Sequence, residues 1–289
     1  MQIDLFGKKR YKVNLHTHTT LSDGRKSPGE VVQIYREHGY DAIAITDHWL
    51  WSKGSEGEDF TVIPGAEYNI GGNDTLGGVY HILCLGALRE PAVAKSMEAQ
   101  TLIDAIHRAG GTVVLAHPAW SLNTPEQILA LQGVDATEIY NSVSGVHMSR
   151  RADSSILVDM IAARGRIYPL IGDDDVHYYD GTDECKTWIM AEAEDNTSQK
   201  LLEAVREGKF YATQGPEIHL QRTDAGVCVK CSPCREIIFH TARAWAPGRV
   251  LEGEGLTEAC FAVKEEDHFV RAEVVDADGK RAWSNIILL

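Results

Sequence analysis

The sequence has no apolar run long enough to cross a membrane, and its first ten residues lack the apolar segment of a signal peptide. Cysteine is scarce too, because six residues in a chain of 289 are too few for a disulfide scaffold. These absences disfavour a membrane protein and a small disulfide-rich domain. We therefore expect a cytoplasmic protein with reduced thiols and no membrane contact.

Positive charge is also in short supply. Lysine and arginine number 28 against 42 aspartates and glutamates, which gives a formal net charge of −14. A surface that neutralises many phosphates needs a basic surplus, so long nucleic acid is not an expected partner, although a local pocket for one phosphate is compatible with this charge. The content of 44% hydrophobic and 24% charged residues is typical of a folded chain of one or two domains.

Short apolar runs alternate with helical segments over the first two thirds of the chain, which is typical of β/α units with parallel strands. Ser27-Pro28-Gly29-Glu30 combines a helix cap, a proline and a capping glutamate, and Thr124 opens a similar signal. Gly39 and Gly165 mark helix ends. The expected strands cover residues 12–15, 42–46, 62–63, 80–85, 112–116, 137–140 and 167–171.

The helical periodicity fades after about residue 209. Strand-like runs follow at residues 236–240, 260–263 and 269–275, and Asp278-Gly279 predicts a hairpin turn between residues 272–275 and 282–288. We therefore predict an α/β domain over residues 1–209 and a small antiparallel β domain over residues 210–289.

The histidines carry the clearest functional signal. Six of the twelve lie at or beside expected strand ends, each near another potential metal ligand. His16 and His18 are two residues apart on a strand, so their side chains point the same way. In β/α barrels the carboxyl ends of the strands meet on one face, so such residues converge. The candidate ligands are His16, His18, Asp23, His48, Glu67, His81, His117, Asp175 and His177.

Imidazoles and carboxylates suit Mn, Fe or Zn, and the absence of cysteine argues against a purely structural zinc site. Nine ligands are too many for one ion and fit two to three divalent metal ions that share a carboxylate. Each residue alone has an ordinary explanation: Asp23 as a turn residue, Asp47 as a helix cap, and His81 as a hydrogen-bonded polar side chain. Their joint placement at nearly every strand end favours the metal site.

Six short motifs contain most of these candidate ligands: His16-Thr17-His18-Thr19, Ser22-Asp23-Gly24, Thr46-Asp47-His48, Gly65-Ala66-Glu67, Ala116-His117-Pro118 and Asp175-Val176-His177. These motifs resemble those of the PHP (polymerase and histidinol phosphatase) family and follow the family's order across roughly residues 11–180. The resemblance implies a distorted seven-stranded (β/α)7 barrel with a trinuclear metal centre, and the C-terminal part is similar to the β-rich tail of some stand-alone PHP proteins.

The resemblance also implies how the ligands divide. One ion would take His16, His18, Glu67 and Asp175; a second would share Glu67 and add His81 and His117; the third would take Asp23, His48 and His177. The family's last motif usually reads Gly-Ser-Asp-x-His, whereas three aspartates follow Gly172 here, and Asp175 keeps the spacing to His177. We place Asp47 and Asp174 behind the ligands as supporting carboxylates.

The implied activity is that of a phosphoesterase. A water that bridges two ions loses a proton near neutral pH and becomes the nucleophile, and the ions stabilise the charge of the transition state. Catalysis is assigned to Glu67, Asp175 and His177. We expect a phosphatase or phosphodiesterase that acts on a small phosphorylated metabolite, a nucleotide or a short oligonucleotide.

The residues that recognise the substrate are less distinct. Arginine suits phosphate, but each candidate is equally well explained as a solvated surface charge or a loop residue. Glu138 and Asn141 match a family pattern as site-wall residues. Cys228-x-x-Cys231-x-x-Cys234 lacks a suitably spaced fourth ligand, so we interpret it as coincidence. The candidate substrate-binding residues are Arg25, Lys26, Asn141, Arg150 and Arg151.

Two other functions are considered. One is a PHP scaffold that binds metal without catalysis, which the full ligand set disfavours. The other is an amidohydrolase-type barrel that cleaves a C–N bond. Such barrels usually place a lysine after a middle strand, whereas Glu67 holds the bridging position here.

Overall fold

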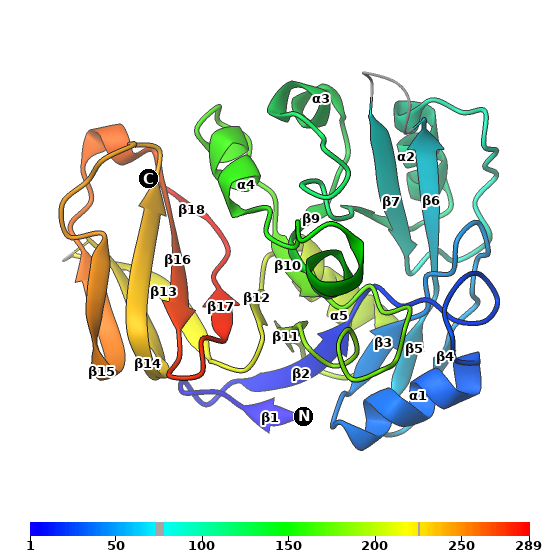
Figure 1. Cartoon of the computed structure of the whole chain (residues 1–289), viewed down its shortest axis with the longest axis horizontal. Helices are drawn as coiled ribbons and strands as arrows, with labels where there is room; N and C mark the ends of the chain where they lie inside the picture. The colour runs from blue at the N-terminus through cyan, green and yellow to red at the C-terminus, as the bar shows by residue number, and fades with distance from the viewer. Residues whose placement is uncertain (73–77, 225) are drawn as a thin grey trace.

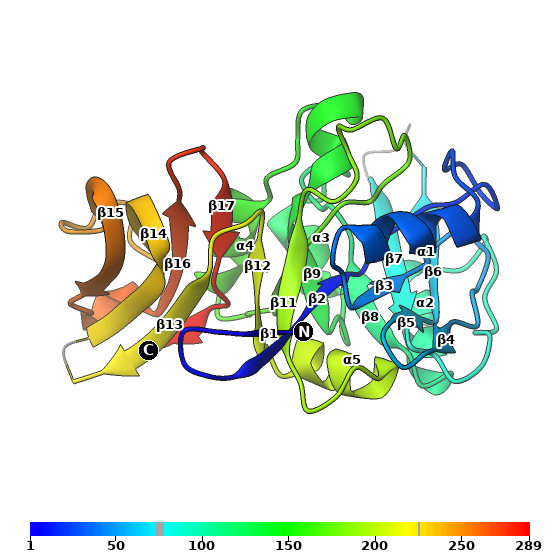
Figure 2. The ribbon, with the colours of Figure 1, turned by 90° about the horizontal axis from the view of Figure 1, so that it is seen from below.

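The computed structural model describes residues 1–72, 78–224 and 226–289. In this part of the chain the strands form two sheets, and no helix is both long and apolar enough to span a membrane. The first two thirds mix strands and helices, whereas the last third is almost entirely β and extends to one side (Figures 1 and 2). A mixed α/β fold with a C-terminal antiparallel β region is therefore confirmed.

The larger sheet runs through both regions. Its strands are β1 (Gln2–Ile3), β2 (Lys9–Asn14), β3 (Ala42–Ala44), β4 (Ser55–Glu56), β5 (Thr61–Ile63), β11 (Trp188–Glu192), β12 (Phe210–Thr213), β13 (Ile218–Thr223), β14 (Gly226–Thr241), β15 (Val250–Phe261), β16 (Phe269–Val275), β17 (Arg281–Trp283) and β18 (Ile287–Leu288). The main path is β13-β14-β16-β17-β12-β11-β2-β3-β5-β4. β2, β3 and β5 pair in parallel, whereas β11 to β18 pair antiparallel.

The smaller sheet has the order β10-β9-β8-β7-β6. These strands are β6 (Gly65–Gly71), β7 (Val79–Leu85), β8 (Thr112–Leu115), β9 (Ala136–Asn141) and β10 (Leu170–Asp173). β8 to β10 are parallel, but β7 is antiparallel to both of its neighbours. The expectation of parallel strands throughout is therefore wrong. β6 and β7 follow each other too closely in sequence for a crossover connection, which needs about a dozen residues or more.

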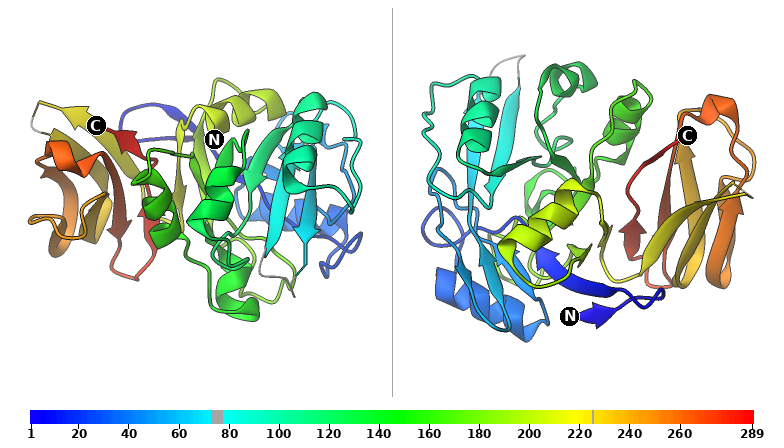
Figure 3. Two further views of the ribbon diagram at one scale, coloured as in Figure 1. Left: turned by 90° about the horizontal axis from the view of Figure 1, so that it is seen from above. Right: turned by 180° about the vertical axis from the view of Figure 1, so that it is seen from behind.

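The described helices are α1 (Pro28–Glu37), α2 (Ala99–Arg108), α3 (Pro125–Ala130), α4 (Ser155–Ala162) and α5 (Ser198–Arg206), with a π-helical turn η1 (Ser144–Met148) and a 3-10 turn η2 (Glu265–Asp267). Two of the helices, α1 and α3, begin where the sequence predicted. Ser27 and Thr124 form the expected capping boxes of α1 and α3. Gly39 has φ +72°, a backbone conformation that glycine adopts without strain. α5 packs against β11 and β5 on the side that Figure 3 shows from behind.

The ladders do not close into one continuous barrel among the described residues. Isolated bridges link the two sheets, among them the parallel bridges of Thr17 with Val176 and of His48 with Glu67. The first links the chain after β2 to the chain after β10, and the second links the chain after β3 to β6. The predicted seven-stranded barrel is therefore not confirmed: the described strands form two sheets, with β10 of the smaller sheet in contact with β11 and β12 of the larger one.

The C-terminal strands are continuous with the α/β region. β12 pairs with β11 on one side and β17 on the other, and Trp283 of β17 stacks on Tyr140 of β9 at a ring distance of 5.1 Å. Val275 pairs with Arg281 across the hairpin predicted at Asp278-Gly279. The division after residue 209 stays a prediction, because one sheet crosses it.

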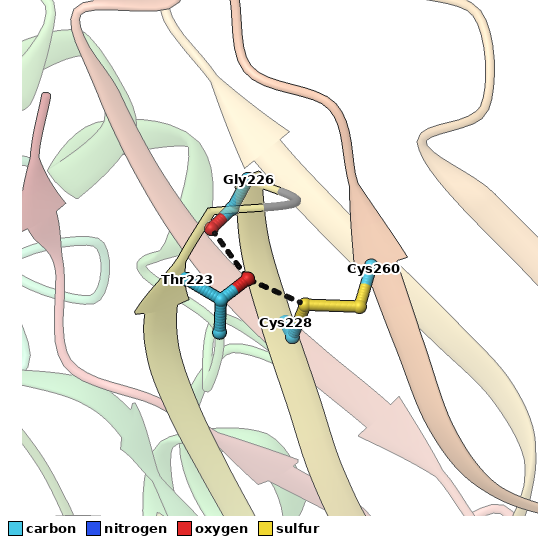
Figure 4. The surroundings of a disulfide bond; sticks show 4 residues. All are labelled: Thr223, Gly226, Cys228 and Cys260. Atoms are coloured by element: carbon cyan, nitrogen blue, oxygen red, sulfur yellow. Dashed lines mark hydrogen bonds between the residues drawn. A yellow bond between two sulfur atoms is a disulfide. The ribbon is translucent and has the colours of Figure 1, made fainter.

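The thiols differ from the expectation. Cys228 and Cys260 form a disulfide between β14 and β15 (Figure 4), so the prediction that all cysteines are reduced is wrong for this pair. The two residues lie 32 positions apart and become neighbours only through the register of the two strands. Cys231 and Cys234 are buried thiols. Disulfides are rare in the cytosol, so the cytoplasmic location remains a prediction only.

Candidate metal centre

The two isolated bridges explain why distant histidines meet. The bridge from Thr17 to Val176 places residues 16–18 beside residues 175–177. The bridge from His48 to Glu67 places the end of β3 beside β6. Glu67 lies inside β6. The nine predicted ligands converge here, in three groups whose ligand atoms lie within 4.8 Å of one another.

The first group contains His16, His18, Glu67 and Asp175. His16 Nε2 lies 3.2 Å from Glu67 Oε2 and 3.1 Å from Asp175 Oδ1. His18 Nε2 lies 3.1 Å from both of these oxygens. Two imidazole nitrogens and two carboxylate oxygens therefore face one point.

The second group shares Glu67 with the first. His81 Nδ1 lies 2.6 Å and His117 Nε2 lies 3.4 Å from Glu67 Oε1. Glu67 thus turns Oε2 toward the first group and Oε1 toward the second. A carboxylate in this position is suited to bridge two ions.

The third group contains Asp23, His48 and His177, and His18 joins it. Asp23 Oδ2 lies 3.7 Å from His48 Nε2 and 3.5 Å from His177 Nε2, and Asp23 Oδ1 lies 3.4 Å from His18 Nδ1. The participation of His18 in two groups was not predicted, because it depends on the fold of the turn that carries Asp23.

The outer nitrogens of three histidines have partners that fix the ring. His16 Nδ1 contacts Glu138 Oε1 at 2.7 Å, His117 Nδ1 contacts Ser121 Oγ at 3.1 Å, and His177 Nδ1 contacts the Asp175 carbonyl oxygen at 2.7 Å. When Nδ1 donates to these oxygens, Nε2 keeps a lone pair that faces the centre. This tautomer is the one that binds a metal.

The carboxylates at the centre favour positive charge on the groups around them. Burial lowers the pKa of His18, but the adjacent carboxylates of Asp175 and Glu67 outweigh burial and raise it to about 9. Burial raises the pKa of Glu67, yet His16 and His81 outweigh it and hold this pKa well below its usual range. With protein groups alone, the carboxylates thus raise the pKa of His16, His18 and His117 and favour protons on these imidazoles. Bound divalent ions would replace those protons.

Two further observations fit a metal centre. Asp175 Oδ1 and His48 Nδ1 are buried and accept or donate no hydrogen bond within the described residues, which leaves lone pairs for a cation. Asp175 and His117 have φ of +51° and +26°, strained for residues other than glycine. Such strain gathers at functional sites. The nitrogen and oxygen donors present therefore suit divalent Mn, Fe or Zn.

Glu138, which the sequence suggested only as a site-wall residue, supports the predicted ligands. It is fully buried, with Oε1 on His16 and Oε2 accepting from the His117 backbone N–H at 2.8 Å and from Asn141 Nδ2 at 2.7 Å. Asn141 also donates to Asp175 Oδ2 at 3.1 Å and is buried, so it positions a predicted ligand. The location of Glu138 and Asn141 on β9, beside β8 and β10, is the feature that could have indicated this supporting role.

The two predicted supporting aspartates accept hydrogen bonds from backbone and hydroxyl groups, not from imidazoles. Asp47 accepts from the backbone and hydroxyl of Thr19 and from Ser22 Oγ, which lies 3.4 Å from His18 Nδ1. Asp47 therefore acts on His18 through the loop. Asp174 accepts from Tyr35 Oη at 2.7 Å and from the backbone N–H groups of residues 185–187.

The predicted substrate cations lie away from the cavities at the centre. Arg25 is stacked 4.6 Å from the Tyr178 ring, Lys26 pairs with Glu30, and Arg150 and Arg151 are exposed. A narrow cavity of about 130 Å³ is lined by residues from each of the three groups. It adjoins a wider cavity of about 550 Å³, with which it shares Asp23, His48, His81 and Trp120. Lys95 lines the wider cavity and was not predicted.

These features define a mixed α/β fold with clusters of potential metal ligands, and a known structure shares the fold. A two-domain protein from Bacteroides vulgatus, which contains a predicted PHP-like metal-dependent phosphoesterase, matches at 15% identity with a TM-score of 0.58, over 100% of this chain and 97% of that one. The family resemblance seen in the sequence is thus confirmed at the level of the fold.

Two other structures are similar but score lower. A candidate metal-dependent phosphoesterase from Bifidobacterium adolescentis has 18% identity and a TM-score of 0.44, over 67% of this chain and 94% of that one. A lesion-specific endonuclease from Pyrococcus furiosus has 11% identity and a TM-score of 0.47, over 82% of this chain and 63% of that one. No model of a known family and no curated protein matches the chain.

Proposed function

We propose that the protein is a trinuclear metal-dependent hydrolase that cleaves a phosphoester of a small metabolite, a nucleotide or a short oligonucleotide. The observation that carries the proposal is the position of Glu67. Its two carboxylate oxygens face two ligand groups, while Asp23, His48 and His177 form a third. The proposed ligands are the nine side chains of these groups, and the catalytic residues are Glu67, Asp175 and His177.

Bound divalent ions would acidify water and neutralise the charge of a transferring phosphoryl group. Side chains of the protein hold the proposed ligands in position. Glu138 holds His16 and the His117 backbone, so the first two groups keep a fixed relation. Burial of Glu67 and Asp175 lowers the local dielectric, which strengthens every charge interaction with a substrate.

The net charge of −14 supports a small or short substrate, because a long polynucleotide needs a basic track. The proposal is tested with purified protein and Mn²⁺ on a panel of phosphomonoesters, phosphodiesters, nucleotides and sugar phosphates. Amide substrates are included to test for hydrolysis of a C–N bond. We expect about two to three metal ions per chain, as the ligand count implies, and hydrolysis of at least one phosphoester class that EDTA abolishes.

Metal binding without turnover of any substrate would favour the non-catalytic scaffold. Turnover of amides alone would favour an amidohydrolase. Either result would contradict the proposed phosphoesterase.

A further inference from the structure

The wider cavity beside the metal centre has an aromatic wall. It holds about 550 Å³ and is lined by Trp49, Trp120 and Lys95 together with His48 and His81. This volume is within the range of small-molecule sites, about 300–1,000 Å³. The narrow cavity over the ligand groups offers about 130 Å³ and also contacts Trp120. A substrate that places its phosphoryl group over the ligands would therefore extend its remaining part into the wider cavity.

Trp120 lies at the junction of the two cavities. Its ring meets His81 edge-on at 5.4 Å and His117 edge-on at 4.9 Å between centroids. Two proposed ligands therefore hold one side of the indole, and Trp120 is only partly buried. The half-open indole offers a flat apolar surface to a group attached to the phosphate.

Trp49 is held in place on the same cavity. It follows His48 directly, and its φ of +58° is strained for a bulky side chain. Its backbone N–H donates to the Glu67 carbonyl at 2.9 Å, and its indole Nε1 donates to Asn69 Oδ1 at 2.6 Å. The ring also packs edge-on against Tyr68 at 5.1 Å. Strain that is maintained by this many contacts at a cavity wall indicates that the indole serves the site.

Lys95 supplies the cation of the wall. Its Nζ lies 5.6 Å over the Trp49 ring, and it forms no salt bridge with any residue that the structure describes. The side chain is exposed and can move. Asn69, whose Oδ1 is engaged by Trp49, keeps its amide nitrogen as a donor. An aromatic surface with two polar donors matches a planar ring that carries acceptor atoms at its edge.

We propose that Trp49, Trp120 and Lys95 form a subsite for a nucleobase, so that the phosphoester cleaved at the centre is a nucleotide. This rests on the proposed phosphoesterase function and narrows its substrate class. Stacking on aromatic side chains tolerates any base, so the subsite favours nucleotides over sugar phosphates without choosing among bases.

The test measures kcat and KM of the Mn²⁺-loaded protein with 5′-AMP, phenyl phosphate and glycerol phosphate. Trp120→Ala and Trp49→Ala should each raise KM for 5′-AMP by about 10-fold or more, as the loss of one stacked base implies. The kcat/KM for glycerol phosphate should change far less. Trp120→Phe should restore most of the AMP affinity, because phenylalanine keeps a stacking face. Trp245→Ala, which removes a 77% exposed tryptophan of the C-terminal region, is the matched control and should leave all three substrates unaffected.

An equal fall in kcat/KM for AMP and glycerol phosphate would mean that the tryptophans only support the metal ligands. That result would overturn the proposed subsite. Equal KM changes for phenyl phosphate and AMP would mean that the aromatic wall binds any aryl ring. That result would overturn the proposal that the substrate is a nucleotide. Adenosine has no phosphoester, so its binding, followed by tryptophan fluorescence, is independent of turnover. Saturable adenosine quenching that is lost in Trp120→Ala supports the subsite even if no phosphoester is cleaved, and the absence of binding overturns it.

Discussion

The metal centre and the C-terminal β region both bury carboxylates, but different residue types neutralise the carboxylate charge in the two regions. In the C-terminal region, Arg271 is fully buried and its Nε and Nη2 contact both oxygens of Asp159 on α4 at 2.6 and 2.8 Å. Glu273 beside it pairs with Arg281. At the metal centre, the buried Glu67 and Asp175 and the exposed Asp23 form ion pairs only with histidines, and no lysine or arginine is paired to them among the described residues.

The difference shows which buried charges the chain satisfies by itself. Arginine is always protonated, so the Asp159 pair is complete within the protein. Imidazole can lose its proton and keep a lone pair, so the centre can exchange protons for metal ions. A buried carboxylate surrounded by histidines is therefore a better indicator of function here than one paired with arginine, which joins α4 to β16.

The largest expected effect would come from breaking the complete pair. Arg271→Met leaves Asp159 without its main cation and should lower the free energy of unfolding by about 3–5 kcal/mol, measured by urea denaturation. Arg164→Met is the matched control, because Arg164 and Glu126 form an exposed pair at 2.9 Å that should contribute less than about 1 kcal/mol. Equal losses of unfolding free energy in the two variants would contradict the view that the Arg271–Asp159 pair is a buried, stabilising pair.

A slightly smaller effect is expected at the incomplete site. Glu67→Ala removes the carboxylate shared by two ligand groups, so kcat/KM should fall by more than about 100-fold, close to 3 kcal/mol of transition-state stabilisation. The metal content, measured by elemental analysis, should drop by at least one ion per chain. Glu194→Ala, at an exposed position, should keep both values. Full activity in Glu67→Ala would mean that the bridge is misassigned.

The smallest effect concerns His240, a histidine that faces arginine instead of a metal site. Burial and then the Arg271 charge lower its pKa to about 4 from the usual 6.5, against an opposing Asp159. The unfolded chain therefore binds a proton more readily between these values, and stability is lost as the pH falls from 6.5 through about 4. Wild type should lose on the order of 2 kcal/mol more than His240→Gln over this window. Parallel stability curves for the two proteins would contradict the lowered pKa.

Part of this molecule could be predicted from local sequence. Capping residues such as Ser27 and Thr124 act within one helical turn, so the starts of α1 and α3 follow from the sequence. Strand ends are also local, which is why His16, His18 and His117 were found beside them. The antiparallel position of β7 was missed, because apolar periodicity does not encode strand direction.

Contacts between distant segments could not be predicted. Cys228 meets Cys260 only through the register of β14 and β15. Glu138 looked like a site-wall residue, and only the packing of β9 against β8 and β10 turns it toward His16 and the His117 backbone. Register and packing depend on many residues at once, and the pattern around any one of them does not contain that information.

The sequence by itself determined which donors the protein has for metal: imidazoles and carboxylates near strand ends, with few thiols and little basic charge. The tertiary structure alone decided how they are shared. The bridges at Thr17–Val176 and His48–Glu67 join two sheets, turn one oxygen of Glu67 to each of two groups, and place Trp49 and Trp120 beside them. The physical reason is that residue type fixes the chemistry of a ligand, whereas distances of a few ångströms between ligands are fixed only by the packing of segments far apart in the chain.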